Sequence, residues 1–224
     1  MATLFPRQGQ SVRVFNKAGG VNGYVTSISP AADGSGDLYV IGNFTTYNST
    51  ASKHIIRLNS DGTVDTAFEV GAGFDGFVSS ISAISDGSGD VYVGGGFTTY
   101  NGTASNRIIR LNSDGTVDTA FEIGVGFDEP VLSIIATSDG SGDLYVGGEF
   151  TTYNGIASNR IIRLNSDGTV DTAFAVGSGF NAPVNTLSLA TDGSGDLYVG
   201  GAFSSYQSST VDRIARLNPD GSLN

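Results

Sequence analysis

One stretch of sequence occurs four times in this chain at a constant interval. The motif DGSGD begins at Asp33, Asp86, Asp139 and Asp192, so successive copies start 53 residues apart. The motif RLN keeps the same interval and begins at Arg57, Arg110, Arg163 and Arg216. A fixed period of this size indicates a repeat architecture, in which each copy folds into one unit that packs on its neighbours.

Each copy contains four segments with the character of short strands. In the second copy these segments are 78–85, 91–97, 107–112 and 117–123, and the gaps between them are rich in Gly, Asn and Asp. Alternating apolar and polar residues and an abundance of β-formers favour strands, and Asp-Gly favours hairpin turns. Four such strands make one antiparallel sheet, and sheets stacked radially bury one another. The sequence therefore predicts an all-β fold, a four-bladed β-propeller with four antiparallel strands per blade.

The two ends of the chain predict how such a ring would close. The final blade spans 184–217 and lacks a clear fourth strand, whereas residues 11–17 lie one period before the fourth strand at 64–70. We therefore expect the N-terminal strand 11–17 to complete the last blade, so that 1–224 form a single domain. By the same shift, residues 1–10 overlap the final RLNPDGSLN, so one tail must lie outside the sheet. An open array and a dimeric ring of eight blades are the alternatives.

The repeated motifs resemble those of a known family. The run RLNSDGTVDTAF, followed by VGxGF and preceded by LYVGGxF, is similar to the delta-60 β-propeller repeat family of bacterial and phage-associated proteins. The similarity covers nearly the whole chain. It implies a propeller of the kind often found within large surface or adhesion-type proteins, and it brings no general catalytic motif with it.

Composition narrows the classes of partner. The formal net charge is −11, with 22 acidic and 11 basic residues, so phosphate backbones and anionic lipids would be repelled. An acidic balance also fits simple solubility. No apolar run reaches the roughly 18 residues that span a bilayer, and no segment resembles a signal peptide. We expect no nucleic-acid partner and no membrane insertion, and a location in the cytosol or export without a cleaved signal, as in a virion or other extracellular assembly.

The loop FTTYNG recurs and presents a tyrosine followed by an amide in every copy. Such a pair can hold a sugar, because the ring stacks on C–H groups and the amide bonds to hydroxyls. Four weak sites on one face would gain avidity. The alternative is that each tyrosine fixes its loop against the blade. The candidate glycan-binding residues are Tyr47, Asn48, Tyr100, Asn101, Tyr153, Asn154, Tyr206 and Gln207.

The DGSGD and SDGTVD segments carry oxygen ligands at alternate positions, as the first part of a calcium loop does. In the second copy these are Asp86, Ser88 and Asp90, but Val91 stands where a calcium loop has glycine. The other interpretation is a turn in which the aspartate bonds to the backbone, as Asx turns do. We expect the turn and no cofactor, and calcium stays open as the alternative.

Arginines inside the third strand of each copy need partners if they are buried. Asp65, Asp118 and Asp171 follow one hairpin later, so we expect structural pairs with Arg57, Arg110 and Arg163 rather than an anion site. The chain has one histidine, His54, and no cysteine. With no clustered acids or bases, the sequence predicts a non-enzymatic protein.

Copies two and three differ mainly from Glu122 onward, in the connections 122–130 and 175–183. A single asymmetric partner would distinguish the blades there, so Asp128, Glu129 and Asn181 are the candidate partner-contact residues. Function is therefore expected to be that of an interaction or structural module, with a protein assembly as partner. A multivalent glycan-binding propeller that recognises surface glycans is the alternative.

Overall fold

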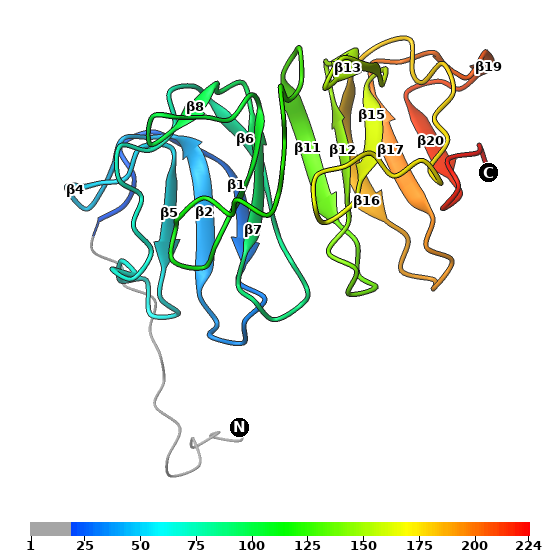
Figure 1. Ribbon diagram of the computed structural model, residues 1–224. Coiled ribbons are helices and arrows are strands. Elements are labelled where there is room, and N and C mark those ends of the chain that lie inside the picture. Colours follow the sequence, from blue (N-terminus) through cyan, green and yellow to red (C-terminus); the bar gives the residue numbers. More distant parts are fainter. Residues whose placement is uncertain (1–18) are drawn as a thin grey trace, which may run out of the picture.

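The computed structural model describes residues 19–224 as a row of four similar antiparallel sheets, which we call blades 1 to 4 (Figure 1). In each blade the second strand lies between the first and the third. The strands are β1 (Tyr24–Pro30), β2 (Leu38–Asn43) and β5 (Ile55–Leu58) in blade 1; β6 (Val78–Ala83), β7 (Val91–Gly95) and β10 (Ile108–Leu111) in blade 2; β11 (Val131–Ala136), β12 (Leu144–Gly148) and β15 (Ile161–Leu164) in blade 3; and β16 (Val184–Leu189), β17 (Leu197–Gly201) and β20 (Ile214–Leu217) in blade 4.

A small hairpin stands between the second and third strands of every blade. Asn101, at the tip of the hairpin in blade 2, has a φ of 49° and Gly102 has a φ of 79°, the left-handed values that a tight two-residue turn requires. The four hairpins pair β3 (Thr46–Tyr47) with β4 (Thr50–Ala51), β8 (Thr99–Tyr100) with β9 (Thr103–Ala104), β13 (Thr152–Tyr153) with β14 (Ile156–Ala157), and β18 (Ser205–Tyr206) with β19 (Ser209–Thr210).

The predicted fourth strand is wrong in blades 1 to 3, because each of these sheets has three strands. In blade 2 the segment 117–123 keeps a single bridge, between Leu111 and Val117, and then leaves the sheet. The carboxylate of Asp118 accepts the N–H of Ala120 at 2.9 Å, and the N–H of Phe121 turns back to the carbonyl of Asp118 at 3.4 Å. An aspartate that bonds locally to the backbone competes with strand pairing, so the segment forms a turn instead.

The turn segment ends on the next blade. The N–H of Glu122 donates to the carbonyl of Asp167 in blade 3 at 2.9 Å, and the equivalent Glu69 and Ala175 bond to Asp114 and Asp220 in the same way. The side chain of Phe121 lies in the core formed between blades 2 and 3, near Tyr92. Each connection therefore joins two consecutive blades.

Successive blades pack through their first strands, and the core is divided among these junctions. At the junction of blades 2 and 3, Val131 and Ile134 of β11 are buried against β7 of blade 2. A bulge near Ser79 in β6 turns that hydroxyl towards blade 3, where it donates to the carbonyl of Val131 at 2.6 Å. We call the contacts of blades 1 and 2, 2 and 3, and 3 and 4 the first, second and third junctions.

In the last blade, Leu223 and Asn224 occupy the first two positions of the segment that we expected the N-terminal strand to fill. Leu223 forms a bridge with Leu217, and the N–H of Asn224 donates to the carbonyl of Arg216 at 2.9 Å. Asp171 makes the same backbone bond in blade 3. The expected closing strand, 11–17, lies outside the described residues.

A ring closed within four blades is not present in the part of the chain that the structure describes. Blade 1 and blade 4 lie at opposite ends of the row (Figure 1), and the close packing of first strands joins consecutive blades only. Within residues 19–224, the four repeats are therefore blade-like sheet units in an open array. The residues from 19 onward contain no helix long and apolar enough to cross a membrane.

Candidate functional site

The four loop tyrosines are core residues. Tyr100, Tyr153 and Tyr206 are at most 1% exposed and Tyr47 is 6% exposed. The hydroxyl of Tyr100 donates to the carbonyl of Gly115 at 2.9 Å, and its ring lies 4.6 Å from that of Phe74. Burial raises the pKa of the Tyr100 hydroxyl to about 12. These rings have no free face for a sugar, so the proposed stacking role of Tyr47, Tyr100, Tyr153 and Tyr206 is wrong.

The amides beside these tyrosines also have structural roles. Asn101 and Asn154 accept the N–H groups of Gly73 and Gly126 at 2.9 Å, and Gln207 donates to the carbonyl of Ala175 at 3.0 Å. In blade 1 the backbone N–H of Asn48 donates to the carbonyl of Gly20 at 3.0 Å. These bonds connect each hairpin to the segment that leads into its blade. They agree with the alternative prediction, in which the FTTYNG loop is fixed against the blade.

The strand arginines form the predicted ion pairs. The guanidinium of Arg110 lies 3.0 Å from Asp118, and the equivalent pairs Arg57–Asp65 and Arg163–Asp171 are both 3.2 Å apart. Each arginine also has a second partner that we did not predict, the last aspartate of DGSGD. In blade 2, Asp90 lies 3.0 Å from Arg110. The constant separation of 20 residues between this aspartate and the arginine in all four copies was the available signal.

The DGSGD segments form the predicted Asx turns. Asp86 accepts the N–H of Ser88 at 2.8 Å, and Asp114 accepts the N–H of Thr116 at 2.9 Å in the second turn type. The pKa of Asp139 is lowered to about 2, first by the Ser141 hydroxyl and then by the Ser141 N–H and Thr137. Residues 19–224 contain no group of three His, Asp or Glu side chains placed to hold a metal.

The candidate partner-contact residues lie on exposed connections, but two of them have internal roles. Asp128 accepts the N–H groups of Thr151 and Thr152, each at 2.9 Å, and Asn181 accepts those of Ser204 and Ser205 at 3.0 and 3.1 Å. Burial would raise the pKa of Asp128, but the bonds from Thr151 and Thr152 outweigh it and lower this pKa. Glu129 is exposed on the same connection.

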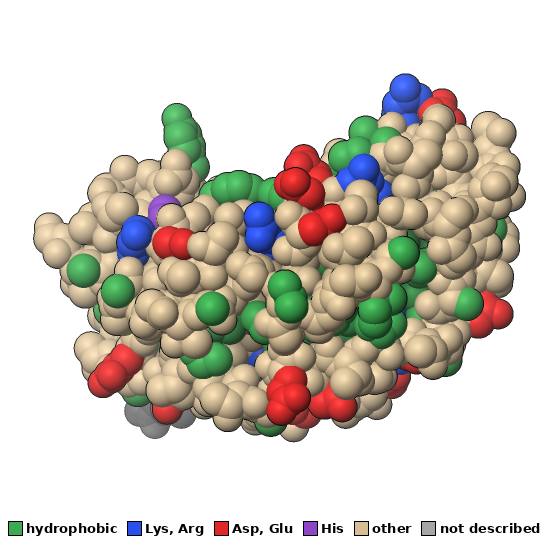
Figure 2. Space-filling model, turned by 45° about the horizontal axis from the view of Figure 1, so that its top comes forward, with side chains coloured by type: hydrophobic (Ala, Val, Ile, Leu, Met, Phe, Trp, Pro, Cys, Tyr) green, Lys and Arg blue, Asp and Glu red, His purple; other side chains and the backbone are tan. Residues whose placement is uncertain are grey.

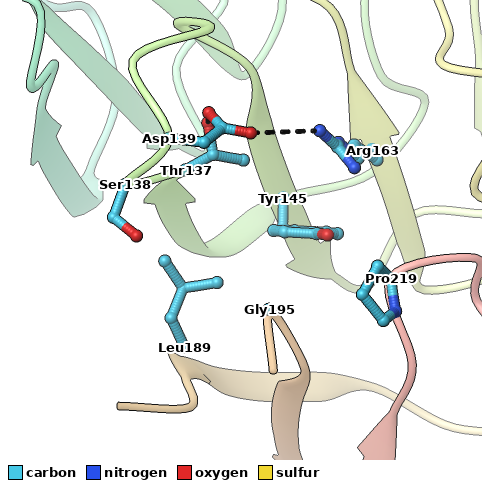
Figure 3. A pocket seen from close by; sticks show the side chains of 8 residues that line it. All are labelled: Thr137, Ser138, Asp139, Tyr145, Arg163, Leu189, Gly195 and Pro219. Carbon is cyan, nitrogen blue, oxygen red and sulfur yellow. Dashed lines mark hydrogen bonds and ion pairs between the residues drawn. The ribbon is translucent and has the colours of Figure 1, made fainter. Parts of the chain in front are cut away.

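One pocket lies at the third junction (Figure 3). It has a volume of about 120 Å³, and Asp139 and Arg163 of blade 3 face Leu189, Gly195 and Pro219 of blade 4 across it. Pro219 stands where the other junctions have Ser113 and Ser166, whose carbonyls accept a bond from the preceding blade's arginine. The pocket is smaller than the few hundred Å³ of ordinary ligand sites, and its charged groups are already paired.

Charged side chains are dispersed on the face that Figure 2 shows, with acidic groups in red and basic groups in blue lying among polar and apolar ones. Among the residues from 19 onward, exposed large apolar side chains are found mainly on the first strand of blade 1, on blade 4 and on the connections. Most of these apolar side chains therefore lie on the first and last blades of the array, whereas Phe77, Val125 and Ile156 lie between them.

Repeated antiparallel sheet units with radial-type junctions define this protein as a β-propeller repeat protein. The chain belongs to the family described as domain of unknown function (DUF5122) beta-propeller, whose model matches residues 33–68, 86–121, 137–174 and 193–224. A comparison with curated protein sequences found no match.

Two solved structures match this chain, and the first of them resembles it in fold. A GH74 enzyme from Niastella koreensis matches with a TM-score of 0.54 and 16% identity over 89% of this chain and 29% of that one. The chain thus spans less than a third of that enzyme's length. A chain of the mitotic checkpoint complex matches with a TM-score of 0.48 and 16% identity, over 99% of this chain and 73% of that one.

Proposed function

We propose that this protein is a non-enzymatic structural or interaction module that acts as part of a larger assembly, such as a virion or other extracellular assembly. The observation that carries the proposal is that the repeated polar groups bond within the fold. In the described blades the Arg–Asp pairs, the Asx turns and the hairpin tyrosines are bonded to the fold itself. Because these repeated polar groups bond to other parts of the same blade or to the next blade, we infer that their role is to hold the blades together.

The connections between blades supply the surface on which a partner could distinguish one blade from another. On the connection between blades 2 and 3, Val125 is 73% exposed and Glu129 is exposed. The equivalent connection between blades 3 and 4 has Ser178 and Ala182 at these positions. The proposed contact for an asymmetric protein partner is therefore the surface formed by Val125 and Glu129, beside Asp128.

The repeat motifs quoted above also support the delta-60 type within this propeller family. That assignment adds no catalytic residue to the proposal. It is consistent with a module whose blades serve as a frame for binding.

The test uses the full chain, tagged and recovered with its native assembly. Val125→Asp and Glu129→Lys should each reduce the amount of partner recovered. The matched control, Ser178→Asp, places the same charge on the equivalent exposed position of the next connection and should leave recovery unchanged. Equal recovery with all three variants would contradict the proposed contact, and specific binding on a glycan array would contradict the protein-binding role.

A further inference from the structure

The first strand of blade 1 exposes the residues that every other blade buries. Val25 is 43% exposed, whereas the equivalent Val78, Val131 and Val184 are at most 1% exposed. Ile28 is 57% exposed, and the equivalent Ile81, Ile134 and Leu187 are at most 8% exposed. In blades 2 to 4 these side chains fill the junction with the preceding blade, so blade 1 presents one half of an unformed junction.

Blade 4 presents the other half. An apolar groove of about 160 Å³ opens on it, lined by Thr186, Tyr198, Gly200 and Ile214 among others. Ile214 is 69% exposed, whereas the equivalent Ile55, Ile108 and Ile161 are fully buried. Tyr198 is 39% exposed, whereas Tyr39, Tyr92 and Tyr145 are at most 2% exposed.

The internal junctions show what fits this groove. A Cβ placed on Gly147 of blade 3 would lie 3.2 Å from the Cβ of Val184, and close to Leu187. Gly94 has the same relation to Val131 and Ile134 at the second junction. Gly200 is the equivalent glycine in blade 4, so the side chains that match its groove are a valine and an isoleucine or leucine at the spacing of Val25 and Ile28.

The exposed faces of blades 1 and 4 also carry the hydrogen-bond donors and acceptors that pair at the internal junctions, at equivalent positions. The hydroxyl oxygens of Ser80 and Ser133 accept the N–H groups of Ile134 and Leu187 at 2.9 and 3.1 Å. Thr186 is the equivalent hydroxyl on blade 4, and the N–H of Ile28 is the equivalent donor on blade 1. The hydroxyls of Tyr39 and Tyr92 donate to the carbonyls of Gly89 and Gly142 in the next blade, and Tyr198 and Gly36 are their counterparts at the ends.

One bond of the internal junctions has no counterpart. Ala83 and Ala136 donate N–H groups to Ser29 and Ser82, but the equivalent residue on blade 1 is Pro30, which has no N–H. The third junction forms without this bond as well, because Ile135 replaces the serine there. The loss therefore does not prevent a junction.

We propose that a second copy of this chain occupies both ends, so that two arrays joined head to tail form one closed ring of eight blades. Head-to-tail contacts produce a ring when the rotation closes and a filament when it does not. Propellers have typically four to eight blades, so two copies of four reach the upper end of that range and three copies exceed it. Both junctions would be identical and would resemble the three already present within each chain.

The experiment measures the solution mass of the full chain by light scattering and native mass spectrometry over a concentration series. The wild type should have twice the 23.0 kDa mass of one chain. Ile28→Asp and Ile214→Asp, on opposite ends, should each shift the protein to the single-chain mass, with the circular dichroism spectrum preserved. Ile156→Asp is the matched control, because Ile156 is 54% exposed on the β13–β14 hairpin, away from both ends.

Three results would overturn the proposal. A wild type with the mass of one chain would show that the ends stay free or are covered by another segment. A dimer that one of the two end variants disrupts and the other does not would indicate pairing through a single face. A mass above two chains would indicate a filament or a larger ring.

Discussion

The hydroxyl of Tyr100 donates to the carbonyl of Gly115 at 2.9 Å, linking the hairpin of blade 2 to the turn that follows its third strand. The same bond joins Tyr47, Tyr153 and Tyr206 to Gly62, Gly168 and Gly221. It occurs in all four blades, so it belongs to the frame of the repeat.

Removing this hydroxyl should destabilise the protein without changing its shape. Tyr100→Phe leaves a buried carbonyl without its partner, so we expect the free energy of unfolding to fall by about 1–3 kcal/mol. Tyr100→Ala also creates a cavity and should cost about 3–5 kcal/mol. Urea denaturation measures both. Tyr24→Phe is the control, because Tyr24 is 80% exposed, and a loss there as large as at Tyr100 would contradict a specific role for the bond.

Arg110 should be essential to blade 2 because it lies between two carboxylates. Arg110→Met leaves Asp90 and Asp118 close together and partly buried, and breaking such a pair typically costs about 3–5 kcal/mol. The control is Arg213→Met, which removes an ion pair with Asp212 in which both side chains are about 70% exposed, and such pairs contribute about 0–1 kcal/mol. Thermal unfolding of the two variants gives the comparison, and equal losses would argue against the buried network.

Acid should weaken the protein through the aspartates that hold the hairpins. Burial would raise the pKa of Asp75, but the bonds from Thr98 and Thr99 outweigh it and lower this pKa to about 2. The folded-state pKa is thus below the unfolded value of about 3.9. The stability that this carboxylate contributes is therefore complete above about pH 4 and is lost as the pH falls towards 2.

Blade 1 has an asparagine at the position of Asp75, so the repeat shows that Asp75→Asn can keep these bonds. Asn22 accepts the N–H groups of Thr45 and Thr46 at 2.8 and 3.0 Å, in the position that Asp75 has in blade 2. The double variant Asp75→Asn, Asp128→Asn should unfold at nearly the wild-type temperature at pH 7 and lose less stability between pH 4 and pH 2. Parallel pH profiles for variant and wild type would show that these carboxylates do not cause the acid sensitivity.

The sequence predicted the repeat unit well because its signals are local. The period of 53 residues, the Asp-Gly turns and the Arg57–Asp65 type of pair are properties of neighbouring segments, and the structure has all three. The fourth strand was wrong because the alternation around Val117 looks like a strand, whereas the Asp118 carboxylate bonds to Ala120 and turns the chain.

The loop tyrosines and the ring could not be derived in this way. Whether Tyr100 points outward or inward depends on Phe74, which comes from a different segment, and on Gly115 in a third. Closure depends on the rotation between blades, which side chains such as Val131 and Ile134 set by their packing at a junction. The number of repeats in the sequence does not determine the rotation between blades, so ring closure could not be predicted from it.

Engineered disulfides test directly whether the ends meet, because the chain has no cysteine of its own. The pair Gly147→Cys, Val184→Cys is the internal control, since the Cβ separation of 3.2 Å at this junction is close to the 3.5–4.5 Å of disulfides. After oxidation it should form a bond within one chain.

The equivalent pair across the proposed contact is Val25→Cys, Gly200→Cys in the same chain. On oxidation this variant should form a covalent dimer of twice 23.0 kDa on a denaturing gel. If the control closes while cysteines 25 and 200 stay reduced, or bond within a single chain as a four-bladed ring would require, the two-chain ring is contradicted.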